Sequence, residues 1–337
     1  MAYRVYLAIA GEDKISIWSL DAATGALELQ ENLDLGGGPS PLAVDPTQRF
    51  LYVGLRASCQ MASLRIDPQT GSLSLLGTVP LESDPCFISV DRTGRYLLAS
   101  YYGAGQVSVH AIGVDGTVQP QPIEWRATAP KAHSIHTDRS NRYAFLPHVG
   151  ESNRILQFAF DADTGHLTPN AVPMVVPPEG TGPRHYCYHP TLDCVYFDNE
   201  QASSVTAYHF DSDTGTLEPF QTLSTLPKEF GGPNTCAQIH ITPSGQFLYA
   251  ANRGHDSIAC FAIDASSGRL TALGQQLTEP TPRTFGIDPG GRYLYAAGQG
   301  TGRLAAYRIT AQGTLEPLDT YAIGERPMWV MILEQPM

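Results

Sequence analysis

The sequence is short of positive charge and of long hydrophobic runs. Its 21 Lys and Arg residues are outnumbered by 33 Asp and Glu, which gives a formal net charge of −12. Binding to nucleic acid draws on a basic surface that neutralises phosphates, so this balance argues against nucleic acid as a partner. No apolar run approaches the roughly 18 residues that would span a bilayer, so no membrane partner is expected either.

Paired cysteine motifs are missing as well. The six cysteines show no CxxC spacing and no metal-ligand pattern, and the chain enters its first strand at Tyr3 without a charged start or an apolar leader. We therefore expect a reduced, cytoplasmic protein with no cofactor and no metal site. No segment longer than a strand carries a helical period, which excludes a helical fold.

What the chain does contain is one short tract repeated seven times. Each copy is an apolar strand, a polar turn with a glycine, and a second apolar strand. The turn glycines lie 46, 45, 49, 50, 53 and 45 residues apart: Gly25, Gly71, Gly116, Gly165, Gly215, Gly268 and Gly313. A period of this length built only from short strands is typical of propeller blades.

A second repeated hairpin alternates with the first. Its turns are marked by Asp45, Asp91, Asp138, His189, Thr242 and Asp288, so only six copies are complete. The segment 327–333 supplies the first half of a seventh copy and the segment 6–9 its second half. The sequence therefore predicts an all-β, seven-bladed β-propeller of four-stranded antiparallel blades, one domain over residues 1–337, in which both termini complete the last blade.

The register of the second hairpin gathers distant polar residues. Five places before each turn marker stand Ser40, Cys86, His133, Arg184, Ala237, Arg283 and Met328, and at the far end of the returning strand stand Arg56, Tyr102, Val149, Glu200, Arg253, Gln299 and Glu12. The start of one strand and the end of its antiparallel partner lie at the same sheet edge. In a propeller that edge is one rim of the central channel.

The residues on this rim have the chemistry of an anion site. Four arginines, at positions 56, 184, 253 and 283, would give an acidic protein a local positive field suited to a small molecule with a carboxylate or phosphate. Glu200 and His133 are the groups that can move protons. Tyr102, Gln299 and His185 are further candidates for substrate binding, although strand alternation should turn His185 away from Arg184.

Several segments of the chain resemble a known family. They are Gly182-Pro-Arg-His185, Asn199-Glu200, Ile239-His-Ile-Thr-Pro-Ser-Gly245, Asn252-Arg253, Gly324-Glu-Arg-Pro-Met-Trp329, Ala132-His-Ser134 and Tyr52-Val-Gly-Leu-Arg56. They occur in the same order and over the whole chain as in the seven-bladed lactonase family, which contains propeller-type 6-phosphogluconolactonases and fungal-type carboxy-cis,cis-muconate lactonising enzymes.

The resemblance implies a metal-free catalytic site made of a His, an Arg, a Glu and a second Arg, which map onto His133, Arg184, Glu200 and Arg253. It also implies hydrolysis of the lactone of an anionic sugar acid, with Glu200 or His133 as general base. The loop from Phe145 to Arg154 and the Gln201 that follows Glu200 depart from many relatives, which leaves the substrate's identity open.

Three other functions remain as alternatives. The same site could serve a lactonising or isomerising enzyme acting on an unsaturated dicarboxylate. A non-catalytic scaffold of the WD40 type is disfavoured because the blades lack a Trp-Asp ending and the three Trp residues do not recur at the blade period. A calcium-dependent lactonase would need several acidic ligands at the channel, where the rim offers chiefly Glu200.

Overall fold

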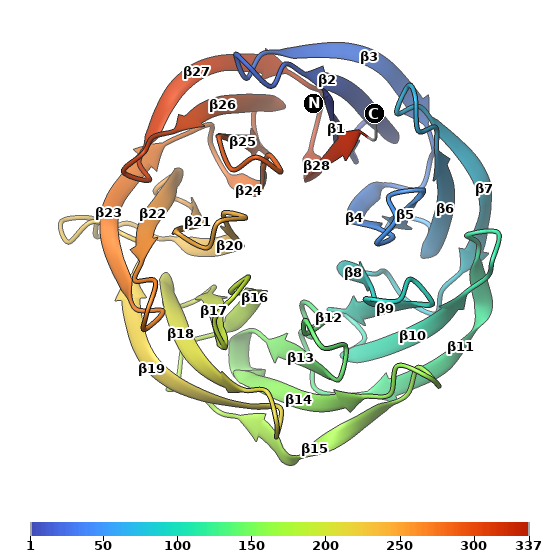
Figure 1. Ribbon diagram of the computed structural model, residues 1–337, viewed down its shortest axis with the longest axis horizontal. Coiled ribbons are helices and arrows are strands. Elements are labelled where there is room, and N and C mark those ends of the chain that lie inside the picture. Colours follow the sequence, from blue (N-terminus) through green and yellow to red (C-terminus); the bar gives the residue numbers. More distant parts are fainter. Residues whose placement is uncertain (1, 336–337) are drawn as a thin grey trace.

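The computed structural model describes residues 2–335 as seven four-stranded antiparallel sheets arranged around a central axis (Figure 1). In that range the only helical element is a single turn of 3₁₀ helix, η1, at Gly150–Ser152. No helix of the described chain has the length and apolar character needed to cross a membrane. The predicted propeller, with four antiparallel strands in each blade, is confirmed.

Each blade places its four strands in a fixed order from the axis outwards. The blade of both termini contains β28 (Pro327–Gln335), β1 (Ala2–Ile9), β2 (Lys14–Leu20) and β3 (Leu27–Asp34). The second contains β4 (Pro39–Val44), β5 (Phe50–Leu55), β6 (Gln60–Ile66) and β7 (Leu73–Pro80). The third contains β8 (Phe87–Val90), β9 (Tyr96–Tyr101), β10 (Gln106–Ile112) and β11 (Val118–Ala127). The fourth contains β12 (His136–Thr137), β13 (Tyr143–His148), β14 (Arg154–Phe160) and β15 (Leu167–Val175).

The remaining three blades follow the same order. The fifth contains β16 (Pro183–Tyr188), β17 (Cys194–Asn199), β18 (Ser204–Asp211) and β19 (Thr216–Ser224). The sixth contains β20 (Thr235–Ile241), β21 (Phe247–Arg253), β22 (Ser257–Ile263) and β23 (Leu270–Leu277). The seventh contains β24 (Pro282–Ile287), β25 (Tyr293–Gly298), β26 (Arg303–Ile309) and β27 (Leu315–Ala322).

The repeated turn markers hold the inner hairpins together. Asp45 accepts the backbone N–H groups of Arg49 and Phe50 on Oδ1, each at 2.7 Å, and so satisfies donors that the turn leaves unpaired. His189 also accepts backbone donors of its turn, through Nδ1, but from residues two and three places on: the N–H groups of Thr191 at 3.1 Å and Leu192 at 2.9 Å. The turn needs an acceptor rather than a carboxylate, which explains why His and Thr replace Asp in two copies.

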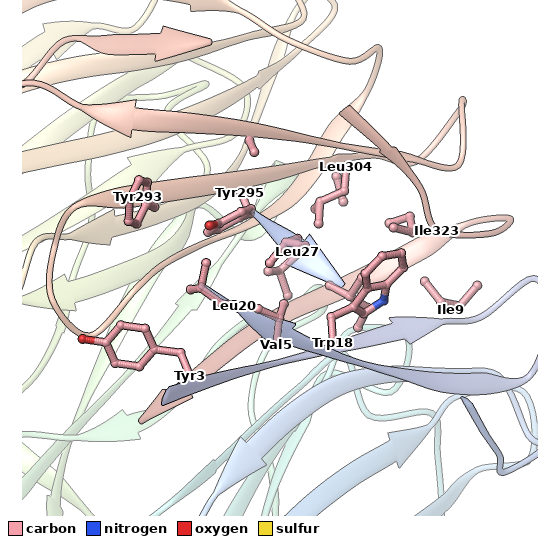
Figure 2. Close-up of a cluster of buried hydrophobic side chains, with 14 residues drawn as sticks. Tyr3, Val5, Ile9, Trp18, Leu20, Leu27, Tyr293, Tyr295, Leu304 and Ile323 are labelled. Atoms are coloured by element: carbon pink, nitrogen blue, oxygen red, sulfur yellow. The ribbon is translucent and has the colours of Figure 1, made fainter. Parts of the chain in front are cut away.

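Both chain ends complete one blade, as predicted. β28 pairs antiparallel with β1 over residues 2–9, so the C-terminal strand lines the axis and the N-terminal strand lies outside it. Buried side chains of this blade interlock with those of the seventh blade, for example Val5 and Leu20 with Tyr295 (Figure 2). The ring therefore closes by backbone hydrogen bonds within one blade and by a hydrophobic core between two.

Five of the inner strands carry a β-bulge near the predicted rim. In the fifth blade, Pro183 of β16 faces Asn199 while Tyr186 faces Phe197, so β16 has one residue more than β17 in this stretch. Comparable register shifts occur where β4, β20, β24 and β28 meet their partners. A bulge interrupts the alternation of side chains and redirects the residues within it.

Three large side chains from alternate blades meet at the axis. The ring of Phe87 (β8) lies 5.1 Å from that of His185 (β16) and 5.6 Å from that of Trp329 (β28), measured between centroids. Because these strands belong to different blades around the axis, the three rings contact one another inside the ring of blades. Phe87 and Trp329 also line a largely apolar chamber of about 370 Å³ farther along the inner strands.

Candidate active site at the rim of the channel

A cavity of about 180 Å³ opens at the predicted rim. Its lining consists of Arg56, Cys86, Tyr102, His133, Arg184, Glu200, Arg253 and Arg283. All of these side chains stand at the two register positions that the repeat brings to one edge. Seven of the nine predicted site residues therefore lie together, although they come from six blades and are spread over more than 200 positions of the sequence.

Glu200 is held by two arginines. Nε of Arg184, at the start of β16, donates to Oε2 of Glu200 at 2.7 Å, and NH2 of Arg253, at the end of β21, lies 3.4 Å from the same oxygen. Arg253 NH2 also donates to the carbonyl of Cys236 at 2.7 Å, which fixes its direction. Within residues 2–335, Oε1 of Glu200 accepts no hydrogen bond from a protein donor, so one oxygen of this carboxylate is left for a ligand or a water.

His133 is a neutral imidazole at the edge of the cavity. Burial, with Arg184 as the next cause, holds the pKa of His133 well below its ordinary value. Its ring contacts Tyr102 and His185 edge to face, with centroids 5.8 and 4.9 Å away. The sequence placed Cys86 at the rim but assigned it no role; its thiol donates to the carbonyl of His133 at 3.2 Å and so helps to hold this segment.

The remaining two arginines differ in how far their charge is neutralised. Arg56 pairs with Asp84, and its Nε donates to Oδ2 of that residue at 3.0 Å. Arg283 makes no ion pair and no side-chain hydrogen bond with any residue of the described chain. Burial and the neighbouring Arg184 lower the pKa of Arg283 to about 9, as expected for a cation that lacks a counter-ion.

Two of the predicted residues do not line the cavity. Gln299 donates through its amide nitrogen to the sulfur of Met328 at 3.1 Å. His185 packs its ring against His133 and Phe87, next to the cavity but outside its lining. The predicted alternation of Arg184 and His185 is wrong, because the bulge in β16 lets both side chains lie on the channel side.

One buried carboxyl at the site was not identified from the sequence. Asp198 is fully buried in β17, two residues before Glu200, and Oδ1 accepts the backbone N–H of His185 at 2.7 Å. Strand alternation places residues 198 and 200 on one face of the strand, and this spacing could have pointed to it. Its position behind Arg184 makes it part of the electrostatics of the cavity.

The charges around the cavity leave it positive. Four arginines line it, and the carboxylates of Glu200 and Asp84 offset two of them, so two positive charges remain when the nearby carboxyl group of Asp198 is neutral. In residues 2–335, no three His, Cys, Asp or Glu side chains come together in a way that could hold a metal ion. The lining therefore suits an anionic organic ligand and offers one carboxylate able to accept a proton.

Comparison with known proteins places this chain in a family. The profile described as "Lactonase, 7-bladed beta-propeller" matches residues 5–332. The chain belongs to the seven-bladed lactonase family. Among curated members of that kind, it is 38% identical over 330 residues to the 6-phosphogluconolactonase of Pectobacterium carotovorum, covering 98% of both chains. It is 35% identical over 333 residues to the 6-phosphogluconolactonase of Yersinia pestis, again with 98% of each chain covered.

Solved structures similar to this chain share the fold of the lactonase family. The periplasmic gluconolactonase of Pseudomonas aeruginosa superposes with a TM-score of 0.92 at 24% identity and covers 100% of both chains. A putative 6-phosphogluconolactonase from Bacteroides uniformis gives a TM-score of 0.89 at 27% identity over 98% of this chain and 99% of its own. The whole described ring is thus common to these lactonase-type propellers.

Proposed function

We propose that this protein is a lactonase that hydrolyses the lactone of an anionic sugar acid at the rim cavity. The observation that carries the proposal is the arrangement of Glu200, whose Oε2 is held by two guanidinium groups while Oε1 is free of donors from the described chain. A carboxylate in this position can take a proton from water without losing its orientation. The names of the curated relatives, which are 6-phosphogluconolactonases, support the same reaction class.

In the proposed reaction, Glu200 takes a proton from a water molecule as that water attacks the ring carbonyl. The resulting tetrahedral oxyanion needs positive donors, which Arg184 and Arg253 can supply because both guanidinium groups reach the cavity. The ring oxygen then leaves and receives the proton from Glu200, which regenerates the carboxylate. His133, which is neutral, can donate or accept a hydrogen bond to the substrate and is the alternative base.

The charge balance favours a substrate with a strongly anionic substituent. A phosphate monoester carries about −1.5 to −2 charges at pH 7, which matches the two uncompensated positive charges of the lining. Arg283, which has no counter-ion within residues 2–335, is the group we assign to this substituent. A carboxylate would be bound by the same guanidinium chemistry but would neutralise less of the charge.

A panel of lactones tests the function. Acid release is followed at neutral pH with six-carbon sugar-acid lactones that carry or lack a phosphate, and with a carboxymuconate. We expect the phosphorylated lactone to have the highest kcat/KM, because only it matches the cavity's charge. If no lactone and no muconate reacts faster than the uncatalysed rate, the proposed function is wrong.

Replacing Arg283 with methionine should raise KM for the phosphorylated lactone by about 10-fold to 100-fold. A hydrogen bond to a charged group contributes about 1.5–3 kcal/mol, and each 1.4 kcal/mol is a factor of ten in affinity. The lactone without phosphate should be affected much less. Steady-state kinetics on both substrates measures the difference.

The matched control for this variant is Arg303→Met. Arg303 lies in β26 outside the cavity, is about half exposed and is 3.6 Å from Glu279, so its loss should leave both KM values unchanged. Equal losses on the phosphorylated and unphosphorylated lactones in Arg283→Met would show that Arg283 does not bind the phosphate.

A further inference from the structure

Asp198, in β17, lies opposite the bulge of β16 at the edge of the cavity. Pro183 faces Asn199 and Tyr186 faces Phe197, so Arg184 and His185 together stand opposite Asp198. The backbone N–H of His185 is not used in the ladder and donates instead to Oδ1 of Asp198 at 2.7 Å. Comparable bulges in β4, β20 and β24 form opposite Gly54, Ala251 and Ala297, so the bulge itself does not require a carboxyl group. In β16 the carboxyl group pairs with an N–H next to Arg184 and so restrains the conformation of this particular bulge.

A carboxyl group at this position is unusual within the molecule. The side chain is fully buried, and Oδ2 has no hydrogen-bond partner in the part of the chain that the structure describes. The equivalent position in the six other blades holds a small or apolar residue: Ala8, Gly54, Ser100, Pro147, Ala251 and Ala297. A buried polar atom without a partner is costly, so its presence in this blade alone calls for a functional reason.

The groups that face Asp198 come from four strands around the site. Arg184 and Cys187 approach it from β16, Glu200 follows it at the end of β17, Cys236 lies on β20 and Arg253 on β21. Burial raises the pKa of Asp198 to about 7, while Arg184 is the largest opposing influence. The carboxyl group is therefore neutral in part of the molecules at neutral pH, unlike an exposed aspartate.

We propose that Asp198 is a positioning residue whose carboxyl group holds the β16 bulge behind Arg184 and whose ionisation weakens the binding of an anionic substrate at the cavity. Neutral Asp198 leaves Arg184 and Arg253 free to act on the ligand. Ionised Asp198 adds a negative charge next to them, which attracts the same guanidinium groups and offsets part of their charge. The predicted effect on turnover rests on the proposed function, whereas the predicted effect on anion binding does not.

The direction of the pH dependence follows from this coupling. An anion bound in front of the arginines disfavours ionisation of Asp198 and raises its pKa, so the neutral form must bind the anion more tightly by the same factor. Affinity for an anion is complete below the pKa of Asp198, which is about 7 in the free protein, and falls as pH rises through it. His133 and His185 do not share this range, because burial keeps both of their pKa values well below the ordinary value.

Sulfate is a suitable probe, because it keeps its double charge across the whole range. Its dissociation constant is measured by calorimetry at pH 6 and pH 8 for the intact protein and for Asp198→Asn. Between pH 6 and pH 8 we expect the wild-type dissociation constant to rise about 3-fold to 10-fold. The upper value applies if ionised Asp198 prevents binding, because the constant then rises tenfold per pH unit above the pKa. The asparagine variant keeps an oxygen acceptor for the His185 N–H but cannot ionise. Its dissociation constant should therefore change by less than about 2-fold, which is the margin we allow for groups other than residue 198. An equal rise in both proteins would overturn the proposal.

A second variant separates position from charge. In Asp198→Ala the His185 N–H loses its acceptor, so kcat/KM on the preferred lactone should fall about 10-fold at both pH values, while Asp198→Asn should match wild type at pH 6. An alanine variant with wild-type activity would show that the bulge does not depend on Asp198. Absence of lactone turnover in the wild type would refute the proposed function alone, because the sulfate measurement needs no catalysis.

Discussion

Replacing Glu200 with glutamine should lower kcat by about 100-fold to 10,000-fold, the usual contribution of a general base. Glutamine keeps an oxygen that can accept from Arg184, so the side chain can stay in place while it loses the ability to take a proton. The effect should therefore fall mainly on kcat. Single-turnover and steady-state assays on the preferred lactone, with a thermal melt to check folding, measure it.

Glu12→Gln is the matched control for that variant. Strand pairing places Ala10 rather than Glu12 at the register position of Glu200 in the blade of both termini. Glu12 lies in the turn after β1, outside the cavity, where it pairs with Lys14 at 2.6 Å and accepts the N–H of Glu325 at 2.8 Å. Its replacement should leave kcat unchanged. Turnover of Glu200→Gln within about threefold of wild type, far below the usual effect of losing a base, would remove Glu200 from the chemistry and leave His133 as the base.

Deleting residues 326–337, which include the C-terminal strand β28, should abolish stable folding of the ring. β28 is the innermost strand of its blade, and without it β1 would present unpaired N–H and C=O groups to the channel. Burying Val330 and Leu333 contributes about 3–6 kcal/mol in total. That loss alone is a large fraction of the stability of a domain, which is about 5–15 kcal/mol.

Thermal unfolding and proteolysis of a chain ending at Gln335 provide the control, since that chain keeps β28 complete. The shortened chain should be protease-sensitive, and a synthetic peptide of residues 326–335 should restore protection by pairing with β1. A truncated protein that melts within a few degrees of the control would mean that the seam does not hold the ring closed.

Much of the fold could be predicted because the sequence pattern of one blade recurs along the chain. The glycine turns and the Asp45-type turns recur, and the missing hairpin could be recognised from its two halves at residues 327–333 and 6–9. The same register located the cavity, because hairpin pairing brings the start of one strand to the end of the next in every blade. Seven of the nine predicted residues line it for that reason.

The features that the sequence did not predict depend on irregular pairing within a blade and on contacts between blades. His185 lies on the channel side because a bulge adds one residue to β16, and no residue type marks that insertion in the sequence. Gln299 turns to Met328 of the adjacent blade, and Arg56 is neutralised by Asp84, which lies 28 positions away. Such pairings are set by which side chains the closed ring makes neighbours.

The amino-acid sequence by itself determined the number of blades, the joining of the two ends and the ring of arginines with Glu200, because each follows from local strand register repeated at a regular period. Only the tertiary structure decided that Phe87, His185 and Trp329 contact one another around the axis and that Asp198 lies buried next to Arg184. These features arise from side chains that share one confined volume, either across blades or across a bulge, where burial and nearby charge set their behaviour.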